Sequence, residues 1–210
     1  QTVVIDYDDR VFEMCENLKN KGLNVSPLKA DVSKIEQIKD SYKAALEILG
    51  GTVDILINSA GIQRRYPSED FPEEEWSKVI SINLDATFYY CKYAGNTMIK
   101  NGGGKIINIA SLMSFLGGIT IPAYAASKGG VAQLTKALSN DWAAKGICVN
   151  GIAPGMILWP ENEPPEEIKQ KVVSQIEKLF DTTVDDALLI EISKYQIMAK
   201  HLLQQLNKAE

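Results

Sequence analysis

A tyrosine and a lysine stand four residues apart in the run Pro-Ala-Tyr-Ala-Ala-Ser-Lys, as Tyr124 and Lys128. On an α-helix, positions i and i+4 share one face, which brings the phenol beside the ammonium. A neighbouring cation favours the phenolate and so lowers the pKa of a tyrosine. Such a phenol can exchange a proton with an alcohol or a carbonyl near neutral pH. The spacing also fits a solvated helix face, so the surrounding residues must decide.

Two further polar residues are candidates for the same chemistry. Ser111 follows the apolar run 105–110 and comes 13 residues before Tyr124. Asn83 stands in Ser-Ile-Asn-Leu, at the start of a predicted helix or inside it. A hydroxyl and an amide can orient a reacting oxygen and a proton donor. Taken alone, Asn83 also fits a helix N-cap, and Ser111 fits a loop hydroxyl bonded to its own backbone.

The elements that must position these residues alternate along the chain. Short apolar runs predict buried strands, and amphipathic segments between them predict helices. Such an alternation favours a parallel sheet covered on both faces, an α/β doubly wound fold of the Rossmann type, with ligands at the carboxyl ends of the strands. We expect strands at 2–5, 24–28, 53–57, 105–110 and 147–152, and helices at 9–21, 33–49, 76–80, 84–100 and 123–145, with a capping box at 33–36.

Together these motifs resemble the short-chain dehydrogenase/reductase family from about Thr2 to Gly155. The resemblance implies that Tyr124 is the general acid/base for alcohol–ketone interconversion. It implies that Lys128 holds the nicotinamide ribose and lowers the pKa of the tyrosine. By the same resemblance, Ser111 hydrogen-bonds the reacting oxygen and Asn83 organises a water-linked proton relay. Residues 1–157 are then a truncated Rossmann-type domain.

The resemblance also implies a nicotinamide cofactor. NAD is favoured because Asp6 follows the first strand and would repel a 2′-phosphate, as would Asp8. Tyr7 can instead occupy the decisive position, which leaves NADP open. Besides Asp6 and the Tyr124–Lys128 pair, the positions implied in cofactor binding are Asp31, Val32, Asn58, Ala60, Gly61, Pro154 and Gly155.

Three segments narrow the resemblance to gluconate and deoxygluconate dehydrogenases, whose substrates are sugar acids: 61–65, 114–120 and 134–142. Arg64 or Arg65 could pair with the substrate carboxylate, because a guanidinium matches its geometry. An ordinary pair of solvated arginines is an equal alternative. The predicted helices 84–100 and 123–145 match those of the family's oligomer interface, which implies a homodimer or homotetramer.

One motif of the family is absent from these 210 residues. It is the Gly-rich turn T-G-x-x-x-G-x-G after the family's first strand, which holds the cofactor pyrophosphate at a helix N-terminus. The strand before that turn would be central, between those starting at Thr2 and Val53. Without it, the sheet has either an unpaired gap or a rearranged order.

Residues 158–210 differ in character from the rest. They are expected to form a helical segment that packs on the domain or on a partner subunit. Its last helix is expected from near Thr183 to about Asn207, with a heptad-like apolar stripe from Leu188 to Leu206. Three hypotheses follow: a dehydrogenase with an altered cofactor cradle, a catalytically impaired remnant of the family, or a helix-mediated interaction protein.

Composition excludes several other classes. The net charge of −5 and the pI near 5.1 argue against nucleic-acid binding. His201 is the only histidine, and the three cysteines form no CxxC pair, so neither a metal site nor a His-dependent triad is expected. No apolar run reaches the length of a membrane span, and no signal peptide is visible. We expect a soluble cytoplasmic protein that acts on a small molecule.

Overall fold

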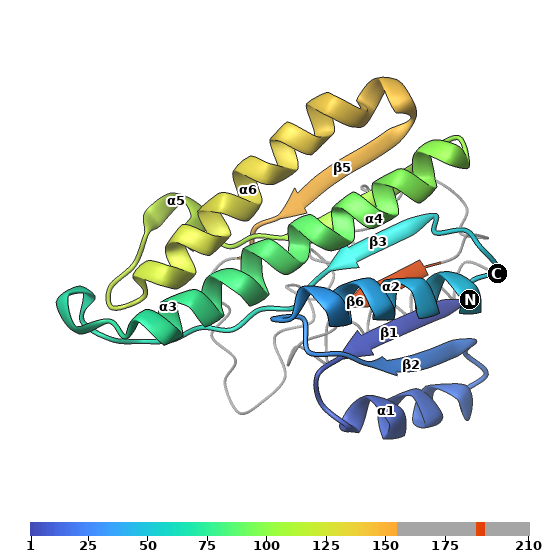
Figure 1. Ribbon diagram of the computed structural model, residues 1–210, viewed down its shortest axis with the longest axis horizontal. Coiled ribbons are helices and arrows are strands. Elements are labelled where there is room, and N and C mark those ends of the chain that lie inside the picture. Colours follow the sequence, from blue (N-terminus) through green and yellow to red (C-terminus); the bar gives the residue numbers. More distant parts are fainter. Residues whose placement is uncertain (155–187, 192–210) are drawn as a thin grey trace, which may run out of the picture.

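A six-stranded parallel sheet forms the centre of the molecule (Figure 1). The computed structural model describes residues 1–154 and 188–191. The strand order is β2-β1-β6-β3-β4-β5, and every neighbouring pair is parallel. The strands are β1 Thr2–Asp6, β2 Val25–Lys29, β3 Ile55–Asn58, β4 Gly104–Ile109, β5 Ile147–Ile152 and β6 Leu188–Glu191.

The helices of the described residues fall close to the predicted segments, except the short helix 113–116, which was not predicted. Helices α3 and α4 are joined without a break by a π-helical turn, Ser81–Asp85. Gly146 ends the helix 122–142 and its 3₁₀ extension 143–145 in the left-handed conformation, at φ 78°. The helices are α1 Arg10–Lys19, α2 Ile35–Ile48, α3 Glu73–Ile80, α4 Ala86–Lys100, α5 Met113–Leu116 and α6 Pro122–Trp142.

The predicted capping box before α2 is wrong. Lys34 is the N-cap residue, and it makes no side-chain capping bond. Ser33 instead donates its hydroxyl to the carboxylate of Asp31, 2.6 Å away. Asp31, two residues after the preceding strand, offers a charged acceptor, which binds a hydroxyl more strongly than a neutral one does.

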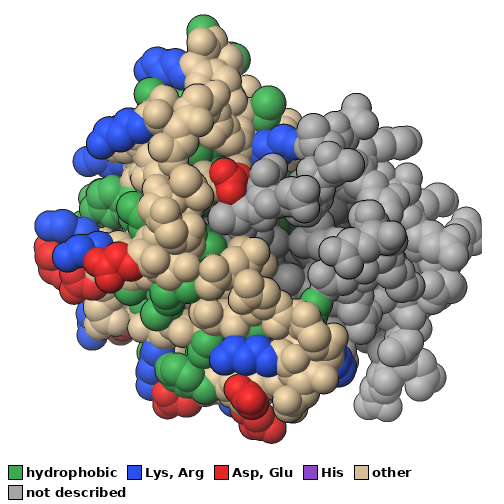
Figure 2. Space-filling model, turned by 90° about the vertical axis from the view of Figure 1, so that its right-hand side faces the viewer, with side chains coloured by type: hydrophobic (Ala, Val, Ile, Leu, Met, Phe, Trp, Pro, Cys, Tyr) green, Lys and Arg blue, Asp and Glu red, His purple; other side chains and the backbone are tan. Residues whose placement is uncertain are grey.

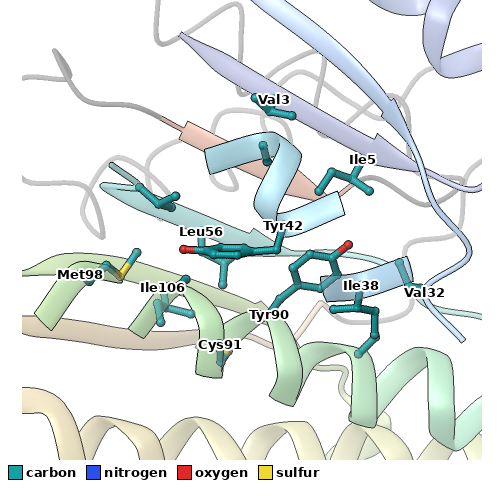
Figure 3. Close-up of a cluster of buried hydrophobic side chains, with 14 of the residues drawn as sticks. Val3, Ile5, Val32, Ile38, Tyr42, Leu56, Tyr90, Cys91, Met98 and Ile106 are labelled. Atoms are coloured by element: carbon teal, nitrogen blue, oxygen red, sulfur yellow. The ribbon is translucent and has the colours of Figure 1, made fainter. Parts of the chain in front are cut away.

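Two apolar clusters cover opposite faces of the sheet, which confirms the doubly wound class. Successive side chains of a strand point to opposite faces. Val3 and Ile5 accordingly join the cluster under α2 and α4, whereas Val4 joins the cluster under α1. Figure 3 shows the first cluster, in which Tyr42 and Tyr90 lie between α2 and α4. The sheet is therefore a buried platform of fixed register.

The two buried tyrosines satisfy their hydroxyls within this cluster. Tyr90 is fully buried, and its hydroxyl lies 2.7 Å from that of Ser41. Tyr42 donates to Thr97, also at 2.7 Å, and burial raises the pKa of Tyr42. Because buried polar groups need partners, these bonds fix α2 against α4.

The sheet is rearranged at its centre. β6 occupies the gap between β1 and β3 and pairs with both, with Leu188 level with Thr2 and Ile55. The helix expected from Thr183 to Asn207 is therefore wrong at Leu188–Glu191; the remainder of 155–210 lies outside the described residues. The physical reason is that two facing strand edges need hydrogen-bond partners, and a short apolar run suits a central parallel strand.

The carboxyl ends of all six strands point toward the end of the molecule where α3 and α5 lie (Figure 1). Figure 2 shows the face on the side of the N-terminus, where acidic and basic side chains of the described residues are interspersed. Among the described residues, no helix is long and apolar enough to cross a membrane. A ligand is expected at the opposite end of the sheet, at the strand carboxyl ends.

Candidate active site

Tyr124 and Lys128 lie in the first turns of α6, as their spacing predicts. The ammonium of Lys128 is 6.0 Å from the centroid of the Tyr124 ring. Lys128 is buried, and its Nζ donates to the carbonyl of Ile109, at the carboxyl end of β4, over 2.5 Å. A buried ammonium needs such an acceptor, because losing its water is costly. The bond fixes the cation beside the phenol at the end of the sheet.

Asn83 is buried in the π-helical turn between α3 and α4. Its amide accepts a bond from the N–H of Ile62 over 2.8 Å and donates to the carbonyl of Ile62 over 3.0 Å. It also donates to the hydroxyl of Ser127 on α6, at 3.0 Å. Asn83 is thus no helix cap: it joins three segments around the Tyr124–Lys128 pair. π-Helical turns are often found at functional sites.

Ser111 follows β4 and is nearly buried. Its hydroxyl accepts a bond from the N–H of Met113 over 3.1 Å, as the loop interpretation predicts. A hydroxyl has one donor and two acceptor sites, so this bond leaves its hydrogen available for another acceptor. The structural bond and the proposed catalytic one are therefore compatible.

Two serines that the sequence analysis did not select complete the arrangement. Ser127 accepts the bond from Asn83 and donates to the carbonyl of Tyr124 over 2.8 Å. Ser114 accepts the N–H of Ser111 at 3.2 Å and donates to the carbonyl of Lys128 at 2.7 Å. Their only signal in the sequence is position: each comes three residues after a candidate residue, within one helical turn.

Gly61 brings the backbone after β3 close to the polar cluster. A Cβ at this residue would lie 3.4 Å from Oδ1 of Asn83 and 3.5 Å from Nζ of Lys128. A larger side chain would occupy the space beside the ammonium. Glycine at this position therefore lets the backbone after β3 approach Asn83 and Lys128 closely.

The two arginines after Gly61 differ in their surroundings. Nε of Arg64 pairs with the carboxylate of Glu75 on α3 over 2.7 Å, and both side chains are largely shielded from solvent. Arg65 is exposed and has no ion pair among the described residues. The sequence could not distinguish them, because Glu75 lies on another element.

Asp6 ends β1, and Asp31 comes two residues after β2; both are predicted cofactor contacts. Asp6 accepts the N–H of Asp8 over 2.9 Å, and burial raises the pKa of Asp6 despite such bonds. Burial would also raise the pKa of Asp31, but hydrogen bonds from Ser33 together with the charge of Lys34 outweigh it and lower the pKa. Val32 beside it is buried. Both residues lie at the carboxyl ends of the strands, as Lys128 does.

Asn58 is buried at the end of β3, and its amide belongs to a hydrogen-bond network on the face of the sheet that α4 and α6 cover. Nδ2 of Asn58 donates to Asn108 over 2.8 Å and to the thiol of Cys91 over 3.1 Å, and Asn108 donates to Thr135 over 3.0 Å. Oδ1 of Asn58 has no partner in the described part of the chain. These bonds tie β3 and β4 to α4 and α6.

Pro154 lies just after β5, and its carbonyl accepts the N–H of Leu112 over 2.9 Å. This bond brings the end of β5 beside Ser111, at the start of the turn that leads to α5. Gly155, the other predicted residue of this turn, lies outside the described residues.

Comparison with known proteins identifies the lineage. The family model for short chain dehydrogenase matches residues 1–170. The chain belongs to the short-chain dehydrogenase family. It is 50% identical over 147 residues to 2-dehydro-3-deoxy-D-gluconate 5-dehydrogenase of Bacillus subtilis, a match that covers 70% of this chain and 57% of that protein. The chain thus spans little more than half the length of that relative.

Solved structures agree with this placement. A gluconate 5-dehydrogenase from Burkholderia cenocepacia, in complex with NADP and tartrate, superposes with a TM-score of 0.67 at 33% identity, over 74% of this chain and 71% of that one. A putative gluconate dehydrogenase from Agrobacterium tumefaciens gives 0.74 at 32% identity, over 89% and 83%. The predicted family and fold class are confirmed.

Proposed function

We propose that this chain belongs to an oxidoreductase that interconverts a secondary alcohol and a ketone of a sugar acid, using a nicotinamide dinucleotide. The observation that carries the proposal is the buried ammonium of Lys128 beside the ring of Tyr124. The names of the relatives, which act on gluconate and its keto and deoxy derivatives, support the substrate class. The alternatives of an impaired remnant and an interaction protein gain no support from these relatives.

The proposed roles follow from the contacts of each side chain. The Tyr124 hydroxyl exchanges a proton with the substrate oxygen, and the charge of Lys128 favours its phenolate. The Ser111 hydroxyl donates to the same oxygen, on which negative charge develops during reduction. Asn83 holds Ile62 and Ser127 in place and so fixes both walls of the site. The bound nicotinamide supplies or accepts the hydride.

Most of the residues that would hold the dinucleotide lie at or just after the carboxyl ends of the strands. Support comes from the cation at Lys128 and from Gly61, whose Cβ position would lie only 3.5 Å from that ammonium. We propose NAD as the cofactor, because a carboxylate at Asp6 opposes a 2′-phosphate; NADP in the Burkholderia structure makes it the competing choice. The proposed contacts are Asp6, Asp31, Val32, Asn58, Ala60, Gly61, Tyr124, Lys128, Pro154 and Gly155.

Arg64 or Arg65 is the proposed source of the charge that recognises the substrate carboxylate. They follow Gly61, whose backbone adjoins Lys128, and the relatives named for sugar acids support a cationic subsite. A guanidinium binds a carboxylate through two parallel hydrogen bonds, which a neutral sugar cannot reproduce. The loop after β3 would then recognise the substrate, and Tyr124 on α6 would transfer the proton.

We also propose a homodimer or homotetramer built on α4 and α6. Phe88 and Ile99 of α4 are 40% and 38% exposed, which supports an apolar contact on this helix. Size-exclusion chromatography with light scattering tests it: Phe88→Glu together with Ile99→Glu is expected to shift the mass to that of a monomer. An unchanged mass would refute an interface on α4.

The decisive experiment measures turnover and cofactor binding separately. Wild-type protein is titrated with NADH and with NADPH by fluorescence, and assayed with gluconate and with 2-dehydro-3-deoxy-D-gluconate. Tyr124→Phe keeps the ring and removes the proton donor, so it is expected to lose turnover and retain NADH affinity. Tyr89→Phe is the control. Absence of NADH and NADPH binding at millimolar concentration would refute the proposal.

A further inference from the structure

Ser114 lies in the first turn of α5, three residues after Ser111, and its hydroxyl bonds two different segments. It accepts the N–H of Ser111 over 3.2 Å and donates to the carbonyl of Lys128 over 2.7 Å. The N–H of Ser114 in turn donates to the carbonyl of Ser111 over 3.0 Å. One hydroxyl therefore joins the loop after β4, which carries Ser111, to the helix that carries Tyr124.

Lys128 is bonded to this loop through both its side chain and its backbone. Its Nζ donates to the carbonyl of Ile109, two residues before Ser111, and its carbonyl accepts the hydroxyl of Ser114. Bonds to one residue of α6 therefore lie on both sides of Ser111. The ammonium is also the group proposed to hold the nicotinamide ribose. The bond through Ser114 involves only the backbone of Lys128, so it holds the loop to α6 without using the ammonium.

The local structure of α5 explains only part of this arrangement. The hydroxyl of Ser111 accepts the N–H of Met113 over 3.1 Å, and the hydroxyl of Ser114 accepts the N–H of Ser111. Such reciprocal bonds at a helix start resemble a capping box, which needs no second helix. The carbonyl of Lys128 lies inside α6, where a carbonyl can accept a hydroxyl in addition to a backbone N–H. The bond to Lys128 is therefore a link between elements and adds nothing to the cap.

This link matters because the proposed reaction needs two hydroxyls from different elements at one substrate oxygen. The hydroxyl of Ser111 comes from the loop after β4, and that of Tyr124 comes from α6. A displacement of about 1 Å in such a pair can cost up to about a hundredfold in rate. The distance between the loop and the helix must therefore be fixed.

We propose that Ser114 is a positioning residue: it holds Ser111 at a set distance from Tyr124 through the carbonyl of Lys128. The proposal rests on the proposed function in the roles of Ser111 and Tyr124. A serine hydroxyl has a single hydrogen, and Ser114 gives it to Lys128. Ser114 therefore has no hydrogen left for a substrate and acts through Ser111.

The kinetic test asks whether Ser114 acts through Ser111. Oxidation of gluconate and of 2-dehydro-3-deoxy-D-gluconate with NAD is measured for wild type, Ser114→Ala, Ser114→Thr, Ser111→Ala and the double alanine variant. Ser114→Ala is expected to lower kcat about tenfold and to change the KM of the sugar acid less than about twofold, because only the transition state needs the placed hydroxyl. Ser114→Thr keeps the hydroxyl and is expected to restore kcat.

The double variant separates positioning from general stability. In the Ser111→Ala background, Ser114→Ala is expected to lower kcat no further, because no Ser111 hydroxyl remains to be misplaced. A purely structural role would give losses that multiply. Multiplying losses, or a wild-type kcat in Ser114→Ala, would overturn the proposal.

A second measurement needs no turnover. Amide hydrogen exchange by NMR compares the N–H of Ser111 with that of Lys105, which donates to the carbonyl of Asp54 at the other end of β4. Ser114→Ala removes the acceptor of the first N–H and is expected to accelerate its exchange about tenfold relative to the second. Ser114→Thr is expected to keep the wild-type ratio. General destabilisation would accelerate both amides together, so an unchanged ratio in Ser114→Ala would overturn the proposal.

Ser41→Ala is the matched control. Ser41 is also buried, and its hydroxyl also bonds two groups, the carbonyl of Ile38 and the hydroxyl of Tyr90. Its replacement is expected to lower the melting temperature and to leave both kcat and the exchange ratio unchanged. The same loss of kcat in Ser41→Ala would overturn the proposal. A wild type that oxidises neither sugar acid, with the expected exchange ratios, refutes the proposed function and leaves the placement of Ser111 by Ser114 standing.

Discussion

The side-chain amide of Asn83 holds the backbone of Ile62 by both its N–H and its carbonyl, at 2.8 and 3.0 Å. Nδ2 of Asn83, which donates to the Ile62 carbonyl, also donates to the hydroxyl of Ser127 on α6. Asn83 is fully buried, so water cannot reach its amide, and these bonds satisfy its polar atoms instead. The loop that carries the arginines and the helix that carries Tyr124 are thereby joined through one amide.

Asn83→Asp tests this junction, because it keeps the acceptor for the N–H of Ile62 and removes both donors. A buried carboxylate would then face the Ile62 carbonyl, and we expect the free energy of unfolding to fall by at least about 2 kcal/mol. Urea denaturation measures the change. Asn96→Asp is the control: Asn96 is exposed, bonds only the carbonyl of Lys92 one turn earlier, and is expected to change stability by less than about 0.5 kcal/mol. Equal losses would contradict the junction.

Two helical glycines are expected to respond to alanine with opposite signs. A Cβ at Gly95 of α4 would lie 2.7 Å from the Trp142 ring, whereas at Gly129 of α6 the nearest atom, the Ser114 carbonyl oxygen, is 3.8 Å away. Gly95→Ala should destabilise the fold by about 1–3 kcal/mol through overpacking. Gly129→Ala should stabilise it by about 0.5–1 kcal/mol, because alanine restricts the unfolded chain. Thermal unfolding decides, and a neutral or stabilising effect of Gly95→Ala would exclude this packing of α4 against Trp142.

The sequence predicted most of the local structure and the family, because hydrophobic period and motif spacing are properties of neighbouring residues. It failed at Leu188–Glu191. The apolar run Leu188-Leu189-Ile190 fits a helix stripe and a buried strand equally well. Only the open gap between β1 and β3, formed by segments more than a hundred residues away, selects the strand.

The candidate site shows the same division. The Tyr124–Lys128 contact follows from helical spacing, so the sequence was sufficient to predict it. The assignment of Arg64 to Glu75 depends on how the loop lies against α3, which no local pattern specifies. The bond of Asn58 to Asn108 across neighbouring strands likewise required the sheet register.

Two aspartates at the carboxyl ends of the strands should give opposite pH effects on stability. Burial raises the pKa of Asp6 above its ordinary 3.8, so the folded state disfavours its charged form, and stability is lost as pH rises from 3.8 through the folded pKa. The pKa of Asp31 is lowered by its hydrogen bonds, although burial acts against them, so its contribution is present above pH 3.8 and lost as pH falls through the folded pKa.

The measurement is the free energy of unfolding of Asp6→Asn and Asp31→Asn between pH 2.5 and 7. Relative to wild type, Asp6→Asn should be more stable at pH 7, and Asp31→Asn less stable, with both differences shrinking in acid. Asp9→Asn, an exposed residue paired with Lys29, is the control and should stay within about 0.5 kcal/mol. The same sign for Asp6→Asn and Asp31→Asn would contradict these environments.

β6 is expected to be essential, because in the described part of the chain β1 and β3 pair with each other only through it. Ile190→Pro removes one ladder hydrogen bond from this central strand and should cost about 1–3 kcal/mol. Lys29→Pro is the control on the edge strand β2, which already contains Pro27. The N–H of Ala30 donates to β1, so the N–H of Lys29, the preceding residue, points away from β1 and has no ladder bond to lose. Urea denaturation compares the two variants, and hydrogen exchange of the β1 and β3 amides should accelerate only in Ile190→Pro. Equal stability of the two variants, with unchanged exchange, would show that β1 and β3 do not depend on pairing with β6.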